Sequence, residues 1–293
     1  MRRERVAPIR VNALSPSFGV EIEGLDLRQT LDDDSVTVLR EQFDTHGLIL
    51  VRSPGLEADD QAYLTGLVVD RTRRERQDVI ATTHTYANYV TNQDQEGYAP
   101  FGELLFHCDM MWGEKPMEVI SLYGMAIERP AVPTRFINMA RALEMLPEDL
   151  RERISHLQAV HESGQQRRGD HKEQLVEVQH DSVRSTTKPV ILTHPRTGVP
   201  LLYVSQQMTA RIDGMDPETS EALLEELFAH LYREECVVEH DWREGDLVVW
   251  DNLAVQHARG NVEFEGPVRT LRKVIAPKLD LSIAKPKMVK ATT

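Results

Sequence analysis

The 293-residue sequence predicts a mostly β fold with flanking helices, arranged as a double-sheet architecture such as a jelly roll. Two observations lead to this fold class. Short runs rich in valine, isoleucine, leucine and aromatic residues recur along the chain and concentrate in its last third. Only a few segments place apolar residues at helical spacing. We therefore expect a β core with helices packed outside it.

The first elements that the sequence predicts are a helix and a buried strand. Residues 33–46 carry apolar residues at helical spacing, namely Val36, Leu39 and Phe43. Gly47 ends this pattern, and the apolar run at residues 48–51 follows directly. The segment therefore predicts a helix followed by a buried strand.

The middle of the chain predicts two strands and a longer helix. Residues 118–124 and 134–138 are rich in β-branched and aromatic side chains, which favour strands. A helical stretch is expected from about residue 140 to residue 160, with an apolar face that consists of Leu150, Ile154 and Leu157. Residues 164–188 are polar and charged, and they are too long for an ordinary connection. We interpret them as a lid insertion.

The last third begins with a strong helix signal and continues with strands. Asp216 is a helix-capping residue, and Pro217 suits the first helical position. Apolar runs that predict strands lie at residues 201–204, 237–240, 246–250 and 269–275. No repeat or linker divides the chain, so residues 1–293 are expected to form one domain.

Composition limits the classes of partner and compartment. The formal net charge of −13 disfavours phosphate backbones and anionic lipids, so we expect a small-molecule substrate, no nucleic acid and no membrane. Two cysteines, Cys108 and Cys236, do not make a disulfide framework. No segment has the roughly 18 consecutive apolar residues of a membrane span. A cytoplasmic protein is expected, and a homo-oligomer is left open.

A His-x-Asp motif is the first candidate for chemistry. On an extended segment, His107 and Asp109 point to the same face while Cys108 points away. Two such ligands and a distal histidine would form the facial triad of non-haem iron(II) oxygenases. The simpler alternative is a histidine that only hydrogen-bonds a strand neighbour.

His257 is the candidate for the distal histidine. It ends the motif Trp250-Asp251-Asn252-x4-His257, in which a strand rich in valine and tryptophan runs into a polar turn. His-x-Asp, a long gap and this second motif resemble the taurine dioxygenase family of 2-oxoglutarate-dependent oxygenases, which includes herbicide-degrading members. The resemblance extends over nearly the whole chain, and it implies a double-stranded β-helix, or jelly roll.

The resemblance also implies the roles of several residues. His107, Asp109 and His257 would bind Fe(II). Arg269 lies twelve residues after His257, where the family places the arginine that binds the far carboxylate of 2-oxoglutarate. Thr134 matches a threonine that contacts the same carboxylate, or else it is an ordinary strand residue. Arg272 competes with Arg269, but the two would face opposite sides of a strand, and we favour Arg269.

Substrate recognition is less clear from the sequence. Family members that bind sulfonates use an arginine four residues after the co-substrate arginine, and here Lys273 stands at that position. An anionic substrate remains plausible, whereas a sulfonate is in doubt because lysine lacks the planar fork of arginine. Met208 matches an aromatic pocket wall in the family, although a core methionine is the simpler interpretation. Tyr89 belongs to a segment that is expected near the entrance.

The predicted activity is oxidation of a small, anionic organic substrate with O2 and 2-oxoglutarate, which releases succinate and CO2. Hydroxylation and oxidative cleavage both fit, and desaturation or cyclisation stays open. A halogenase would need a small residue where Asp109 stands. Two alternatives from other classes are a zinc-dependent hydrolase on a β scaffold and a non-catalytic jelly-roll binding protein. The chain has no His-Glu-x-x-His motif, which disfavours the hydrolase.

Overall fold

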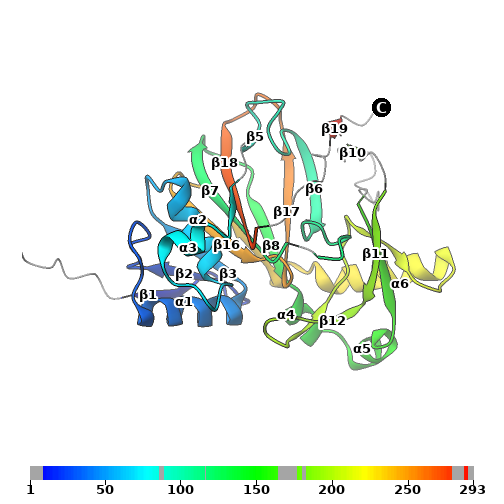
Figure 1. The fold of residues 1–293 in the computed structure, drawn as a ribbon. Helices are drawn as coiled ribbons and strands as arrows, with labels where there is room; N and C mark the ends of the chain where they lie inside the picture. The colour runs from blue at the N-terminus through cyan, green and yellow to red at the C-terminus, as the bar shows by residue number, and fades with distance from the viewer. Residues whose placement is uncertain are drawn as a thin grey trace, which may run out of the picture.

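A computed structural model describes residues 9–85, 89–115, 117–163, 177–179, 183–278 and 287–289. Most of the regular elements in these residues are strands. They form two main sheets, with helices on the outside (Figure 1). The prediction of a mostly β fold with flanking helices is therefore confirmed.

The larger sheet has eight strands within the described residues, in the order β1-β2-β3-β16-β7-β18-β4, with β5 paired to β18. Its strands are β1 (Arg10–Ala13), β2 (Val20–Glu23), β3 (Leu48–Arg52), β4 (His84–Thr85), β5 (Val90–Thr91), β7 (Val119–Ile127), β16 (Asp246–Asp251) and β18 (Arg269–Ala276). The pairs are antiparallel except for β2 with β3, which is parallel.

The smaller main sheet has the order β15-β8-β17-β6 and is antiparallel. Its strands are β6 (Gly102–His107), β8 (Thr134–Asn138), β15 (Val237–His240) and β17 (Val255–Val262). Three further small sheets lie in the described residues. In the first, β9 (Gln158–Glu162) lies between β11 (Ser185–Pro189) and β14 (Thr209–Ile212). The other two are the pairs β12 (Ile191–Thr193) with β13 (Pro200–Leu202), and β10 (Glu177–Gln179) with β19 (Lys287–Val289).

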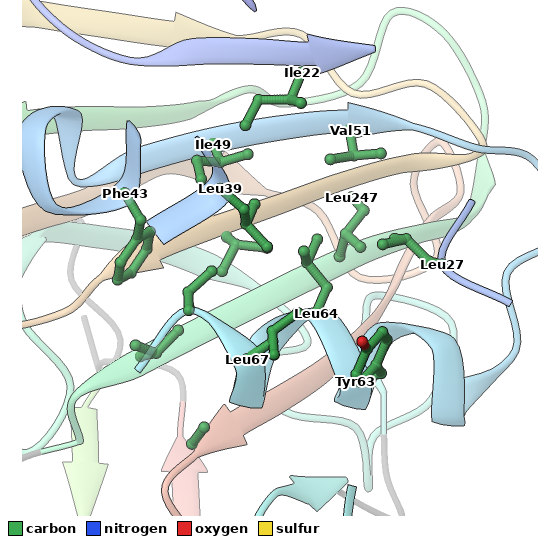
Figure 2. Close-up of a cluster of buried hydrophobic side chains, with 14 of the residues drawn as sticks. Ile22, Leu27, Leu39, Phe43, Ile49, Val51, Tyr63, Leu64, Leu67 and Leu247 are labelled. Atoms are coloured by element: carbon green, nitrogen blue, oxygen red, sulfur yellow. The ribbon is translucent and has the colours of Figure 1, made fainter. Parts of the chain in front are cut away.

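Alternating side chains of the larger sheet build two separate cores. One face packs against helices α1 (Asp33–His46) and α2 (Ala58–Leu67), as Figure 2 shows for Ile49, Leu247 and Leu64. The opposite face packs against the smaller sheet, where Trp250 contacts Phe136 edge to face at 5.4 Å between ring centroids. This alternation follows from the two-residue period of a strand, and it leaves the space between the main sheets lined from both sides.

Three helices cover the other side of the smaller main sheet. They are α4 (Met139–Glu144), α5 (Glu148–Ile154) and α6 (Pro217–Leu231), and their apolar side chains form a third core with Ile137 and Ala258 of that sheet. A short helix α3 (Arg76–Ile80) and a 3-10 turn (Glu234–Cys236) complete the regular elements of the described residues. Within those residues, no helix combines the length and the apolar character that crossing a membrane requires.

Local signals explain where the two predicted helices begin and end. Asp32 caps α1 through Ser35 N at 2.7 Å, and Gly47 ends the helix with a positive φ of 66°. Asp216 caps α6 through Thr219 N at 3.0 Å, with proline at the first helical position. The helices predicted at residues 33–46 and after Asp216 are confirmed, as are the strands expected at residues 118–124, 134–138, 237–240, 246–250 and 269–275.

The helix expected over residues 140–160 is interrupted after Glu144 and is wrong after Ile154. Helix α4 ends at Glu144, and α5 begins only after Pro147, because proline cannot donate the hydrogen bond that would continue a helix. Strand β9 begins at Gln158, so the buried Val160 belongs to a sheet. The apolar side chains of this segment come at a spacing that fits a helix, but tertiary pairing determined the outcome.

The expected lid at residues 164–188 is only partly described. Residues 164–176 and 180–182 lie outside the described residues. Residues 177–179 form β10, which pairs with β19. The end of the segment belongs to β11, which pairs with β9 from Ser185 with Glu162 to Pro189 with Gln158. The last residues of the predicted lid are therefore part of a sheet.

Candidate active site

Strand pairing brings the two histidines of the predicted triad together. His107 is the last residue of β6, and it lies opposite His257 of β17 in the antiparallel pair. Their ring centroids are 4.2 Å apart. Asp109 follows just beyond the end of β6, with Oδ1 at 3.4 Å from Nε2 of His107 and at 3.8 Å from Nε2 of His257. One ligand atom from each of the three residues lies within 4.8 Å of the others, a geometry that could hold a metal ion.

The protonation of this cluster suits a cation. Burial lowers the pKa of His257 well below its ordinary value, and the neighbouring His107 lowers it further, so the imidazole is neutral. Burial would raise the pKa of Asp109, but the charge of Lys273 holds it well below its ordinary value. Nδ1 of His107 lies 2.7 Å from the carbonyl oxygen of Leu105, which leaves the Nε2 lone pair free for a metal.

Arg269 and Thr134 meet between the two main sheets. Arg269 begins β18 in the larger sheet, and its Nη2 donates to Oγ1 of Thr134 in the smaller sheet at 3.0 Å. Its Nε donates to the carbonyl oxygen of Val132 at 2.9 Å. Burial lowers the pKa of Arg269 well below its ordinary value, and the charge of Arg259 adds to this effect. Within the described residues, neither arginine forms an ion pair with a carboxylate.

Arg272 faces the other side of the same strand. Its Nε donates to Oε1 of Gln61 at 2.7 Å, and its Nη2 donates to the carbonyl oxygen of Leu56 at 2.8 Å. The guanidinium also lies over the ring of Tyr123 at 4.8 Å from the centroid. Gln61 lies in α2, Leu56 lies just before α2, and Tyr123 lies in β7. Arg272 therefore connects β18 to the outer layer of helices.

Lys273 returns to the face that Arg269 occupies, and its Nζ contacts Oδ2 of Asp109. The other two candidate substrate residues are placed differently. Met208 packs in a buried apolar cluster with Cys108 and Tyr203. Tyr89 lies just before β5 and is 42% exposed. The structure thus places Lys273 beside Asp109 of the triad. Met208 instead packs against other apolar side chains, including that of Cys108.

Trp242 and Arg259 contact this site and were missed in the sequence. Nε1 of Trp242 donates to Oγ1 of Thr134 at 2.9 Å, so two donors hold this hydroxyl oxygen. Arg259 donates to the carbonyl oxygens of Ala99, Phe101 and Gly102, and these bonds fix the loop that leads into β6. The two-residue spacing from His257 to Arg259 on a strand is a signal that could have indicated Arg259. We find no comparable signal for Trp242.

Known relatives match this chain over most of its length. It is 26% identical to alpha-ketoglutarate-dependent 2,4-dichlorophenoxyacetate dioxygenase of Cupriavidus pinatubonensis, over 84% of this chain and 90% of that protein. It is also 26% identical to an alkylsulfatase of Acinetobacter baylyi, over 91% and 84% respectively. A solved taurine dioxygenase from Burkholderia xenovorans is 25% identical, with a TM-score of 0.68 over 91% of this chain and 90% of that one.

A second solved structure, AAD-2 in complex with Mn(II) and N-oxalylglycine, superposes with a TM-score of 0.73 over 94% of this chain and 99% of that one, at 20% identity. Its likeness establishes the fold. The relatives and the family model identify the chain as a 2-oxoglutarate-dependent dioxygenase, and the His-Asp-His cluster is consistent with this. The chain belongs to the taurine catabolism dioxygenase TauD, TfdA family, whose model matches residues 10–275. The resemblance expected from the sequence is thereby confirmed.

Proposed function

We propose that this enzyme uses Fe(II), 2-oxoglutarate and O2 to hydroxylate or oxidatively cleave a small, anionic organic substrate, with release of succinate and CO2. One observation carries the proposal. The His-Asp-His cluster and the buried pair of Arg269 and Thr134 come from two sheets that pack face to face. The first group suits a divalent metal and the second suits a carboxylate, as a keto acid co-substrate requires.

His107, Asp109 and His257 would hold the iron. Two neutral imidazole nitrogens and one carboxylate are the ligand set of the facial triad, which leaves coordination positions for a co-substrate and for oxygen. With these ligands, the bound iron would let O2 act as the oxidant, which takes two electrons from 2-oxoglutarate and two from a C–H bond of the substrate. The protein contributes the arrangement, because the carbonyl of Leu105 orients His107 and the strand pair fixes His257 opposite.

Arg269 and Thr134 would bind the far carboxylate of 2-oxoglutarate. A buried guanidinium is costly unless an anion pairs with it, and Arg259 adds a second positive charge nearby. The planar fork of Arg269 suits a carboxylate, and Trp242 together with Arg269 orients the hydroxyl of Thr134. A dicarboxylate that reaches from the metal to this pair would provide a ligand for the metal and an anion for Arg269.

The substrate class is proposed from the relatives and from one cation. The relatives' names include a dioxygenase of 2,4-dichlorophenoxyacetate, an alkylsulfatase and a sulfate ester dioxygenase. Lys273 lies beside Asp109, so an anionic group bound there would hold the rest of the substrate close to the metal. Tyr89 and Met208 are weaker candidates, because one is exposed and the other lies in an apolar cluster.

Further properties complete the proposal. We propose that the two main sheets form a double-stranded β-helix, or jelly roll, since both contribute side chains to the core between them. We also propose that residues 1–293 act as a single domain in the cytoplasm. A lid function for the segment at 164–188, most of which lies outside the described residues, and a homo-oligomeric state remain predictions.

Two other functions are tested by the same assay. Two histidines and a carboxylate can also hold zinc for hydrolysis, but the Arg269–Thr134 pair has no part in that chemistry. A binding protein without catalysis could use the same groups to hold a carboxylate ligand, but it would not consume 2-oxoglutarate. Conversion of 2-oxoglutarate to succinate that depends on both iron and oxygen excludes both alternatives.

The first prediction concerns Asp109. The variant Asp109→Ala should release succinate only at background level, because it removes the one carboxylate of the metal site. It should keep its far-UV circular dichroism, since Asp109 lies beyond the end of β6. The exposed Asp149→Ala in α5 is the control and should turn over normally. Normal turnover by Asp109→Ala would refute the ligand set.

A further inference from the structure

A buried asparagine holds the backbone of Asp109. Oδ1 of Asn252 accepts from the backbone N–H of Asp109 at 2.9 Å, and its Nδ2 donates to the carbonyl oxygen of the same residue at 2.9 Å. Nδ2 also donates to the carbonyl oxygen of Met117 at 2.9 Å. Asn252 is fully buried. Through its bonds to Asp109 and Met117, its amide group connects the two ends of the loop that carries Asp109.

A second buried asparagine holds the backbone of Arg269 in a similar way. Oδ1 of Asn92 accepts from the backbone N–H of Arg269 at 3.0 Å. Its Nδ2 donates to the carbonyl oxygens of Glu263 at 3.0 Å and of Pro267 at 2.9 Å. Asn92 is only 2% exposed, and its amide group fixes the turn that leads into β18.

Both asparagines act where a strand ends. Asp109 lies two residues beyond His107, the last residue of β6, and Arg269 is the first residue of β18. At such positions the regular ladder of hydrogen bonds stops, and a backbone group must find another partner or lose its fixed position. An asparagine side chain can donate two hydrogen bonds and accept two. Asn252 donates two and accepts one, whereas Asn92 donates two and accepts a second bond, from Nε2 of Gln93 at 3.1 Å.

We propose that Asn252 and Asn92 are positioning residues, each for one half of the active site. Asn252 places Asp109 for the metal, and Asn92 places Arg269 for the far carboxylate of 2-oxoglutarate. This inference rests on the proposed function, because it takes from it the roles of Asp109 and Arg269. The two asparagines share no hydrogen-bond partner among the described residues, so their effects should separate.

The test compares Asn252→Ala with Asn92→Ala. Each substitution leaves a small polar space that water can enter, so the fold should survive while the backbone loosens. Binding of Mn(II), an ion that does not support turnover, is measured by calorimetry on the metal-free protein. Binding of 2-oxoglutarate is then measured at saturating Mn(II). Asn138→Ala is the control, because Asn138 also accepts from two backbone N–H groups but caps α4.

We expect a crossed result. Asn252→Ala should weaken Mn(II) binding by roughly 10- to 100-fold, the usual effect of losing a group that orients a metal ligand. Its affinity for 2-oxoglutarate at saturating metal should change by no more than about twofold. Asn92→Ala should weaken 2-oxoglutarate by roughly tenfold, about the value of one charge-assisted hydrogen bond, and leave Mn(II) binding within about twofold. Asn138→Ala should alter only the melting temperature.

Two outcomes would overturn the inference. One is that both variants weaken both ligands in proportion to their loss in melting temperature, which indicates a purely structural role. The other is that neither variant weakens its expected ligand. Should an alanine variant not fold, Asn252→Ser and Asn92→Ser are measured in the same way. If the wild-type protein binds neither Mn(II) nor 2-oxoglutarate, the proposed function itself fails, and this result is distinct from both outcomes.

Discussion

Arg269 and Arg272 are three residues apart and have entirely different surroundings. Arg269→Ala should raise the apparent constant for 2-oxoglutarate by roughly 30- to 150-fold, because it removes a charge-assisted bidentate contact worth on the order of 2–3 kcal/mol. Arg272→Ala should leave this constant almost unchanged. It should instead lower the free energy of unfolding by about 2 kcal/mol, because Gln61 and the carbonyl of Leu56 lose their donors.

Initial rates of succinate release at varied 2-oxoglutarate, together with urea unfolding curves, measure both effects. The two variants serve as controls for each other, since each removes one buried guanidinium from the same strand. A higher 2-oxoglutarate constant in Arg272→Ala, with none in Arg269→Ala, would contradict the assignment.

Lys273 should affect the prime substrate and hardly affect 2-oxoglutarate. Lys273→Met keeps the apolar stem and removes the charge beside Asp109. We expect the apparent constant of an anionic substrate, chosen from a panel of aryloxy acids and alkyl sulfates, to rise about 3- to 10-fold. This is less than an arginine would give, because an ammonium provides no bidentate fork. The exposed Lys278→Met is the control. A 2-oxoglutarate constant that rises as much as the substrate constant would contradict this role.

Short motifs made part of the site predictable from the sequence. The two-residue spacing of His107 and Asp109 on a strand places them on one face. His257, Arg269 and Lys273 were implied by the resemblance to the family. Asn92 and Trp242 could not be found in this way, since their contacts depend on how distant loops and strands approach each other. Met208 illustrates the limit, because its position along the chain does not show that it packs in a buried cluster with Cys108 and Tyr203.

Among the elements, the end of β16 depends on a buried ionic group. Asp251 accepts from Nε2 of His194 at 3.2 Å and pairs with Arg196, which also donates to Asp44 of α1 at 2.9 Å. Burial would raise the pKa of Asp251, but the bond from His194 and the charge of Arg196 lower it below its ordinary value. The network joins α1, β16 and the turn between β12 and β13.

This network gives a pH-dependent prediction. Because the folded-state pKa of Asp251 lies below the unfolded value of about 3.9, its contribution to stability is present above about pH 4 and is lost as the pH falls. Asp251→Asn should lower the free energy of unfolding by about 3 kcal/mol at pH 7, since it breaks a buried ion pair. The difference from wild type should shrink toward pH 3 in urea unfolding. Exposed Asp149→Asn should show no such trend, and a difference that is constant with pH would contradict the prediction.

Elements with strong end signals were predictable, and those decided by pairing were not. The caps Asp32, Gly47 and Asp216 mark their helix ends through bonds to nearby backbone, which the sequence displays directly. Strand β9 at Gln158–Glu162 is paired on both sides, with β11 and β14, and this pairing overrode a helical spacing. Short apolar runs of this kind fit either structure until their neighbours are known.

At the scale of the whole molecule, the proposed active site spans two sheets. Arg269 and Lys273 belong to the larger sheet, while their partners Thr134 and Asp109 lie in the smaller sheet or directly follow it. A shift of about 1 Å between reacting groups can cost roughly 100-fold in rate. A small change in the spacing of the two sheets should therefore lower the catalytic rate while the secondary structure stays intact.

Activity should accordingly be lost before the fold. In a urea series, we expect succinate release to fall at a lower concentration than far-UV circular dichroism, because local loosening between the sheets precedes global unfolding. Both signals are recorded on the same samples at saturating Fe(II) and 2-oxoglutarate, so ligand loss does not add to the effect. Coinciding midpoints would show that the two sheets separate only when the whole domain unfolds.

The alternation along β18 also limits which changes of this enzyme can survive in evolution. Arg269 and Lys273 share one face, and Arg272 occupies the other. With the roles proposed for these residues, a point substitution at position 273 would alter the preferred anion while Arg269 keeps its co-substrate contact. A single-residue insertion between 269 and 273 would turn one of the two cations toward the helices. New substrate preferences are therefore accessible by exchange of residues in this strand, and not by a change in its length.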